Sequence, residues 1–207
     1  MTITKISELS KSRVRIEIDN EFAFVLYKGE LSAYEIKQEH EIAEEAYQEI
    51  MTKLLPKRAK LRAMNLLKSR TYTTAQLSEK LKVGGYPDRI IEEAIEYVAS
   101  YGYVNDRQYA YDFIEYNKEI KSKNRIIMDL RKKGISGDVI EEAWEEIVGE
   151  ERQDLEKEQI IKLIEKKHFS SQTATLQEKQ KMMAFLYRKG FAIETIRNVL
   201  SLDITSN

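Results

Sequence analysis

The chain has 207 residues and a net charge of −1; 42% of its residues are hydrophobic, 33% are charged, and only eight are glycine and two proline. So few turn-forming residues exclude a many-stranded sandwich or barrel, while the charge content favours helices that each bury one apolar stripe. The lack of cysteine excludes disulfides and thiolate metal sites, and the two histidines leave little for a histidine-based catalytic centre.

The N-terminal segment predicts a β-hairpin over residues 13–28, followed by a helix. Apolar and polar residues alternate along the first half of this hairpin, which is the pattern of a half-buried strand. Asp19 and Asn20 suit the tight turn between the two strands. From residue 32 to about residue 55 the apolar spacing becomes helical, and Pro56 predicts a break there because proline disfavours a helical conformation in the residue before it.

Beyond Pro56 the chain repeats one pattern three times. Each copy has a leucine, a glycine four residues later, a bulky apolar residue directly after that glycine, and further apolar residues ten and thirteen positions after the leucine. The glycine would supply the left-handed residue that ends one helix, and the bulky residue would pack onto the next helix as a hydrophobic staple. Repeats of this kind predict stacked helical units. The three pairs are Leu81 with Gly85, Leu130 with Gly134, and Leu186 with Gly190.

The prediction is therefore a mainly α-helical, elongated tandem repeat of three-helix units, preceded by the small hairpin and its helix. A capping box at Thr73–Gln76 supports one of the helix starts. The predicted segments are residues 1–55 for the hairpin and acidic helix, and residues 57–100, 101–149 and 150–207 for the three repeats. The predicted helices are 57–69, 74–83 and 88–99, then one from Asp106, 122–132 and 137–148, and finally 152–167, 175–188 and 193–201.

Charge is segregated along the chain. Residues 57–90 carry nine basic residues against two acidic ones, and residues 118–133 carry seven against two, whereas residues 30–49 and 134–165 are strongly acidic. Because like charges one turn apart destabilise a solvated helix, the helix 57–69, with five basic residues and no acidic one, indicates an anionic partner more than simple solubility. For the basic residues around 121–133 the two interpretations stand equal, because cations are favoured at a helix C-terminus by the dipole alone.

Five tyrosines lie between residues 101 and 116, and two interpretations apply to them. They would stack on the bases of a single strand, or they would pack between helices with their hydroxyls in water. We favour packing, and for Trp144 likewise a place in the core. The tyrosines are Tyr101, Tyr103, Tyr109, Tyr111 and Tyr116.

Three stretches, taken in their order and spacing, resemble the RecX family of bacterial regulators of the RecA recombinase. They are Gly102–Ala110 (GYVNDRQYA), Leu130–Ile135 (LRKKGI), and Leu66–Arg70 leading to Leu77–Leu81. The resemblance covers residues 57–200, and the N-terminal hairpin and acidic helix look like an extension that some members have. Two departures are Tyr72–Thr73, where the family often has Arg-Ser, and Asn124, where glycine commonly follows lysine.

The resemblance implies a non-enzymatic modulator, mainly an inhibitor, of RecA. Such a protein would bind in the groove of the RecA–DNA filament and limit filament growth, strand exchange and coprotease activity, and so act in DNA repair, homologous recombination and the SOS response. We expect a cytoplasmic monomer with no cofactor, no metal and no membrane contact, whose partners are the RecA filament and, weakly and without sequence preference, DNA. The residues expected to make electrostatic contacts are Lys57, Arg58, Lys60, Arg62, Arg70, Lys80, Arg125, Lys132 and Lys133.

Two other classes of protein compete with this interpretation. A helix-turn-helix transcriptional regulator would read duplex DNA with the N-terminal turns of its recognition helices. The third helices of the repeats begin at Asp88, Asp138 and Ile193–Glu194, which are acidic or apolar and unsuited to that task. A purely structural helical scaffold would differ in being insensitive to charge reversal on the helix 57–69. Enzyme activity has no residues to support it: His40–Glu44 lacks the second histidine of a metalloprotease helix.

Overall fold

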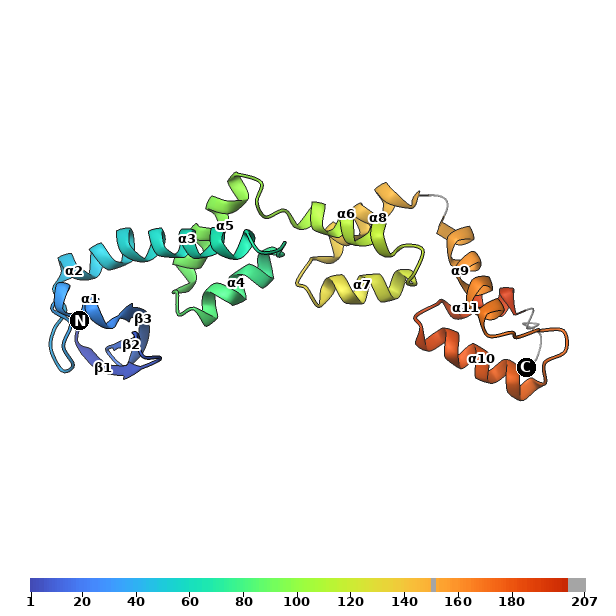
Figure 1. The fold of residues 1–207 in the computed structure, drawn as a ribbon, viewed down its shortest axis with the longest axis horizontal. Coiled ribbons are helices and arrows are strands. Elements are labelled where there is room, and N and C mark those ends of the chain that lie inside the picture. Colours follow the sequence, from blue (N-terminus) through green and yellow to red (C-terminus); the bar gives the residue numbers. More distant parts are fainter. Residues whose placement is uncertain (150–151, 201–207) are drawn as a thin grey trace. The chain divides into compact units, whose positions relative to one another are not determined.

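The computed structural model describes residues 1–149 and 152–200 (Figure 1). The chain divides into two compact units, residues 1–105 and residues 106–207. The first unit holds a small sheet and the first three-helix repeat, and the second unit holds the other two repeats. None of the helices in the described part of the chain is long and apolar enough to cross a membrane.

The N-terminal sheet has three antiparallel strands in the order β1 (Ile3–Glu8), β2 (Arg13–Ile18) and β3 (Glu21–Tyr27). The predicted hairpin is confirmed as β2 and β3. Asp19 and Asn20 between them have φ of 51° and 69°, the left-handed conformation that a two-residue hairpin turn requires. Strand β1 was not predicted, because a register shift between Ile3 and Lys5 breaks the apolar alternation along it.

The predicted helix over residues 32–55 is wrong in its first half. A short helix α1 (Lys28–Ala33) directly follows β3, and the next helix, α2 (Glu44–Glu49), begins only after an irregular segment, residues 34–43. This irregular segment runs along β1: the amide of Ile3 donates to the carbonyl of His40, and the amide of Glu39 donates to the carbonyl of Ile3. Its residues Ile36 and Ile42 are buried in the core with the sheet and not along a helical stripe, which explains their misleading spacing.

The predicted break at Pro56 is also wrong. After α2 the helix continues through a π-helical turn, η1 (Ile50–Leu54), into α3 (Leu55–Leu67). Leu55 keeps helical angles (φ −67°, ψ −43°), and its amide donates to the carbonyl of Ile50, five residues back. A π turn is wider than an α turn, so it relieves the crowding that a proline ring imposes on the preceding turn.

The three tandem three-helix repeats are confirmed, and the described chain is mostly helical. Each repeat contains two helices joined by a glycine turn and a preceding helix that packs with them. The first repeat consists of α3, α4 (Thr74–Val83) and α5 (Asp88–Ser100). The second consists of α6 (Asp106–Asn117), α7 (Lys123–Arg131) and α8 (Gly137–Ile147), and the third of α9 (Arg152–Lys166), α10 (Leu176–Arg188) and α11 (Ile193–Val199).

The glycine turns between the second and third helix of each unit have the predicted geometry. Gly85, Gly134 and Gly190 have φ of 85°, 83° and 91°. At the first of them, the Tyr86 amide lies 3.4 Å from the carbonyl of Leu81 and the Gly85 amide 2.9 Å from that of Lys82, and the other two turns repeat both hydrogen bonds. This pair of bonds defines a Schellman motif, which only a residue tolerant of positive φ can complete without strain.

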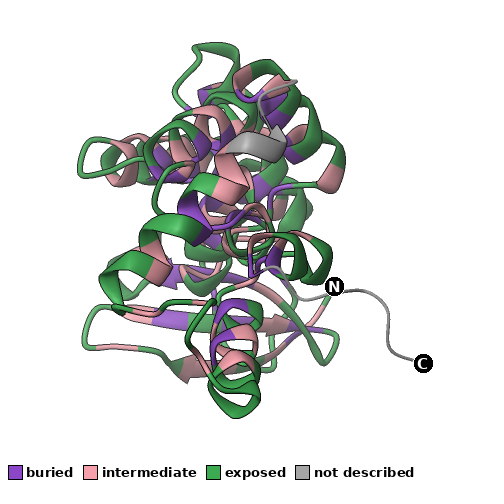
Figure 2. Cartoon of the chain, turned by 90° about the vertical axis from the view of Figure 1, so that its right-hand side faces the viewer, coloured by how far each residue is buried: buried purple, intermediate pink, exposed green. Residues whose placement is uncertain are grey.

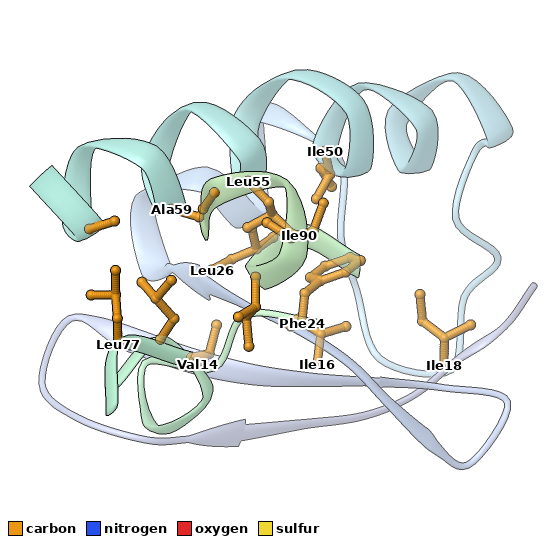
Figure 3. Packing of buried hydrophobic residues seen from close by; sticks show 14 of the residues in the cluster. Val14, Ile16, Ile18, Phe24, Leu26, Ile50, Leu55, Ala59, Leu77 and Ile90 are labelled. Carbon is orange, nitrogen blue, oxygen red and sulfur yellow. The ribbon is translucent and has the colours of Figure 1, made fainter. Parts of the chain in front are cut away.

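Buried side chains form a separate core in each repeat. Buried and exposed residues alternate along the helices, as expected of helices that bury one face (Figure 2). The sheet shares the core of the first repeat: Ile16 and Phe24 from the strands lie with Leu55 of α3 and Ile90 of α5 (Figure 3). Trp144 is buried in the second core, as predicted.

Candidate partner-binding surfaces

The basic residues of α3 lie on two different faces of that helix. At 3.6 residues per turn, Lys57 and Lys60 point one way and Arg58 and Arg62 another. The Lys60 ammonium lies 5.2 Å from the ring centroid of Tyr97 on α5, whereas the Arg58 guanidinium lies 4.7 Å from that of Tyr27 on β3. The basic residues of α3 are therefore divided between an α5 side and a sheet side.

Arg58 contributes to the fold of the first unit. Its guanidinium forms an ion pair with Glu30 on α1, and both side chains are largely shielded from water, with 19% and 23% exposed. Together with the Tyr27 ring, this pair ties α3 to the segment that follows β3. A shielded arginine that already has a carboxylate partner offers little to a second anion, because breaking the pair leaves Glu30 uncompensated.

The turn between α4 and α5 lies near an arginine that no sequence pattern singles out. Burial raises the pKa of Tyr86, in this turn, and the positive charges of Arg58, Arg62 and Arg13 oppose that rise. Arg13 is on β2, so the fold brings it near Tyr86 although the two are far apart in sequence. Only the docking of the sheet on the repeat creates this proximity.

The other predicted contact residues of the first unit are exposed. Arg70 lies over its neighbour Tyr72, with 4.4 Å between the guanidinium carbon and the ring centroid. Lys57, Arg62 and Lys80 are exposed, and no ion-pair partner for them occurs among the described residues. These side chains are accessible to an incoming phosphate or carboxylate.

In the second unit, the basic residues around α7 are largely paired with acidic ones. Asp129 accepts from Lys121 at 2.9 Å and lies 3.4 Å from the Nε atom of Arg125. The hydrogen bond from Lys121 lowers the pKa of Asp129 below its ordinary value, with further lowering from the Lys121, Arg125 and Lys132 charges. Arg125 is therefore partly neutralised, while Lys132 is exposed and has no ion pair in the part of the chain that the structure describes.

Lys133 lies against aromatic rings of the same repeat. Its ammonium is 5.5 Å from the ring centroid of Tyr109 and 5.8 Å from that of Phe113, both on α6. A lysine stem packed on aromatic faces stabilises the contact between helices and still presents its charge to water. Lys133 therefore has a structural role in the second repeat.

The prediction that the tyrosine cluster forms interhelix core is wrong for three of its members. Tyr101, Tyr103 and Tyr116 are 61%, 54% and 78% exposed, while Tyr109 and Tyr111 are half-buried. The apolar residues around them, such as Val98 and Val104, fill the core in their place. Tyrosine content alone cannot distinguish these outcomes, because the ring suits both a core and a wet surface.

The N-terminal turns of the third helices are acidic, as the sequence indicated. Asp88, Asp138 and Glu194 lie in the first turns of α5, α8 and α11. Phosphates are repelled by such positions, and the bases of the major groove would meet no arginine or asparagine there. Within the described residues, no group of three or more histidine and acidic side chains converges to hold a metal ion.

These features define a class of protein: a tandem array of three-helix repeats with separate cores, built on a sheet-supported first repeat. Models of the first, second and third three-helix domains of RecX match residues 59–97, 105–143 and 154–200. The chain belongs to the RecX family.

Relatives match along almost the whole chain. Regulatory protein RecX of Caldanaerobacter subterraneus subsp. tengcongensis is 35% identical over 204 residues, covering 98% of this chain and 100% of that protein. Regulatory protein RecX of Clostridioides difficile is 31% identical over 207 residues, covering 96% of this chain and 94% of that protein.

Solved structures have the same fold. A crystal structure of regulatory protein RecX matches with a TM-score of 0.61 at 22% identity and covers 98% of this chain and 99% of that one. The crystal structure of RecX from Lactobacillus salivarius matches with a TM-score of 0.59 at 21% identity, covering 71% of this chain and 95% of that one.

Proposed function

We propose that this chain is a non-enzymatic regulator, mainly an inhibitor, of the RecA recombinase. In this proposal it binds in the groove of the RecA–DNA filament as a monomer in the cytoplasm, without a cofactor, and limits filament growth, strand exchange and coprotease activity. The observation that supports it most is the RecX family membership, which covers all three repeats and includes relatives named regulatory proteins.

The charge arrangement of the first unit supports an electrostatic mode of binding. Lys57, Arg62 and Lys80 are exposed and without ion-pair partners among the described residues. A filament that carries DNA offers phosphates and acidic side chains, and complementary charge accelerates encounter and fixes orientation. The acidic first turns of the third helices argue against sequence reading by this protein itself.

The test is charge reversal on α3 by the double substitution Lys57→Glu and Arg62→Glu. The variant should lose its inhibition of RecA-driven strand exchange and its retention on RecA filaments in a pull-down, because attraction becomes repulsion at two exposed positions. Circular dichroism and melting temperature should stay unchanged, since exposed substitutions usually cost little. Arg58 stays intact in this variant, because glutamate there would face Glu30 and confuse a folding defect with lost binding.

The matched control reverses two exposed lysines, Lys5 on β1 and Lys11 in the loop between β1 and β2, by Lys5→Glu and Lys11→Glu, which alters net charge equally within the same unit. This control should inhibit like the wild type. If the α3 variant still inhibits at wild-type concentrations, the exposed cations of α3 only face solvent. The contact surface must then be sought among the basic residues around α7. If free RecA or bare DNA retains the wild-type protein as well as filaments do, binding in the groove of the filament is contradicted.

A further inference from the structure

Three tyrosine rings form a ladder at the C-terminal end of α5 and directly after it. The ring centroids of Tyr97 and Tyr101 are 5.1 Å apart in an edge-to-face arrangement, and those of Tyr101 and Tyr103 are 6.0 Å apart with only 18° between their planes. All three residues belong to the first compact unit, so the ladder is defined by that unit alone.

The outer part of this ladder is more exposed than the fold requires. Tyr97 packs partly against the first core, but Tyr101 and Tyr103 are more than half exposed. The turn that carries them is already closed by Gly102, with φ of 72°, and by hydrogen bonds from the Gly102 amide to Ala99 and from the Tyr103 amide to Val98. Two nearly parallel rings in water leave flat apolar faces that another planar ring can cover.

Positive charge accompanies the ladder. The Lys60 ammonium lies 5.2 Å from the Tyr97 ring centroid. A tyrosine is uncharged near neutral pH, and the proximity of Tyr101, together with burial, raises the pKa of Tyr97 still further. The surface therefore joins apolar ring faces with a nearby cation.

From this juxtaposition we infer that Tyr101 and Tyr103 stack on unpaired bases of single-stranded DNA while Lys60 contacts a phosphate beside them. Stacked aromatic rings and flanking cations are the two components of sequence-tolerant single-strand binding. In a duplex the base faces are covered by neighbouring base pairs, so this surface discriminates against duplex DNA. The inference rests on the proposed function and deepens the weak DNA binding expected from the sequence by naming its surface and its preferred form of DNA.

The test measures binding of the full-length chain to a fluorescent thirty-nucleotide thymidine strand and to an abasic strand of equal length. Both strands carry the same phosphates, but only the first offers base faces. The wild type should bind the thymidine strand at least about tenfold more tightly, the scale expected for one or two stacked bases. The variant Tyr101→Ala with Tyr103→Ala should lose this difference and bind both strands with the affinity that the wild type has for the abasic one.

Two further variants separate stacking from other roles. Tyr101→Phe with Tyr103→Phe keeps both ring faces and should keep the preference for the thymidine strand. Tyr116→Ala removes a tyrosine that is 78% exposed in the second unit and should leave binding unchanged. Equal binding of both strands by the wild type, or an undiminished preference in the double alanine variant, would overturn the inference. Because the assay contains no RecA, its failure leaves the proposed inhibition untouched, and lost inhibition by the α3 variant leaves the stacking result untouched.

Discussion

Gly85 meets two separate requirements at one position. Its φ of 85° is in the left-handed region, and a Cβ atom at this position would lie 2.2 Å from Cγ2 of Val25 on β3. The glycine therefore both ends α4 and allows the turn between α4 and α5 to approach the sheet. The first requirement was readable from the repeat pattern, whereas the second depends on a strand far earlier in the chain and on packing that no local pattern encodes.

We expect Gly85→Ala to destabilise the first unit more than Gly102→Ala does. Gly102 also has a positive φ, of 72°, but nothing lies within 4 Å of where its Cβ would be, so its cost is the backbone strain alone, about 1 kcal/mol. At Gly85 the contact with Val25 adds to that strain, for a total of about 2–4 kcal/mol. Thermal or urea unfolding of the full chain measures both.

Gly29→Ala is the matched control in the same unit. It lies in α1, where an added Cβ would have no atom within 4 Å, and we expect a change within about 0.5 kcal/mol. Equal losses for Gly85→Ala and Gly102→Ala would mean that Val25 moves aside without cost. The double requirement at Gly85 would then reduce to its backbone conformation.

Asp129 is the residue through which pH acts on the second repeat. The Lys121 hydrogen bond lowers the pKa of its carboxyl in the folded chain, below the value of about 3.9 that an unfolded aspartate has. A depressed folded pKa means that this stabilisation is fully present above the unfolded pKa and is lost as the pH falls through the folded pKa. Asp129→Asn should therefore melt at a lower temperature than the wild type near pH 7.

The difference between Asp129→Asn and the wild type should shrink as the pH falls below about 4, because the wild-type carboxyl then also becomes neutral. Melting temperatures measured between pH 2.5 and 7 follow this convergence. Glu142 of α8 is exposed and has no ion-pair partner in the described chain, so Glu142→Gln serves as the control. A gap between the Asp129→Asn and wild-type curves that stays constant with pH would show that Asp129 acts by shape and not by charge.

At the scale of the element, local patterns succeeded where one helix or turn contains its own signals. The capping box predicted at Thr73 is present, with its side chain accepting from the Gln76 amide. The hydrophobic staples also fit, since Tyr72 and Leu77 flank that cap and are both buried. Such signals are reliable because their partners lie within a few residues of one another.

Local patterns failed where a distant partner decides the conformation. Ile36 and Ile42 of the irregular segment before α2 are buried in the core that the sheet shares, and the segment is held by backbone hydrogen bonds to β1, a strand whose own alternation is broken. Pro56 suggested a break, yet the π turn before it keeps the helix continuous. The positive charge of α3 was visible in the sequence, but the contacts by which Glu30 and Tyr27 shield Arg58 were not.

At the scale of the whole molecule, the net charge of −1 conceals strongly basic and strongly acidic segments. The fold reduces the basic ones further, because Lys121, Lys123 and Arg125 are paired with acidic side chains. The cations that remain exposed are dispersed over several helices and not aligned on one recognition helix. Both the charge segregation and the acidic starts of the third helices were visible in the sequence, whereas the pairing was not.

This distribution predicts that binding to bare duplex DNA is weak, without sequence preference, and steeply reduced by salt. Because the exposed cations are dispersed, a bound duplex makes only a few phosphate contacts at a time, and the release of counterions from those phosphates is the main source of affinity. Fluorescence anisotropy with two duplexes of unrelated sequence should give equal affinities. Both affinities should fall roughly tenfold or more between about 50 and 200 mM salt, because salt opposes the release of counterions from the contacted phosphates. A nanomolar complex at physiological salt that prefers one of the two duplexes would instead support a helix-turn-helix regulator. That regulator would have to read bases despite Asp88, Asp138 and Glu194 in the first turns of its candidate recognition helices, which is why we expect the two duplexes to bind alike.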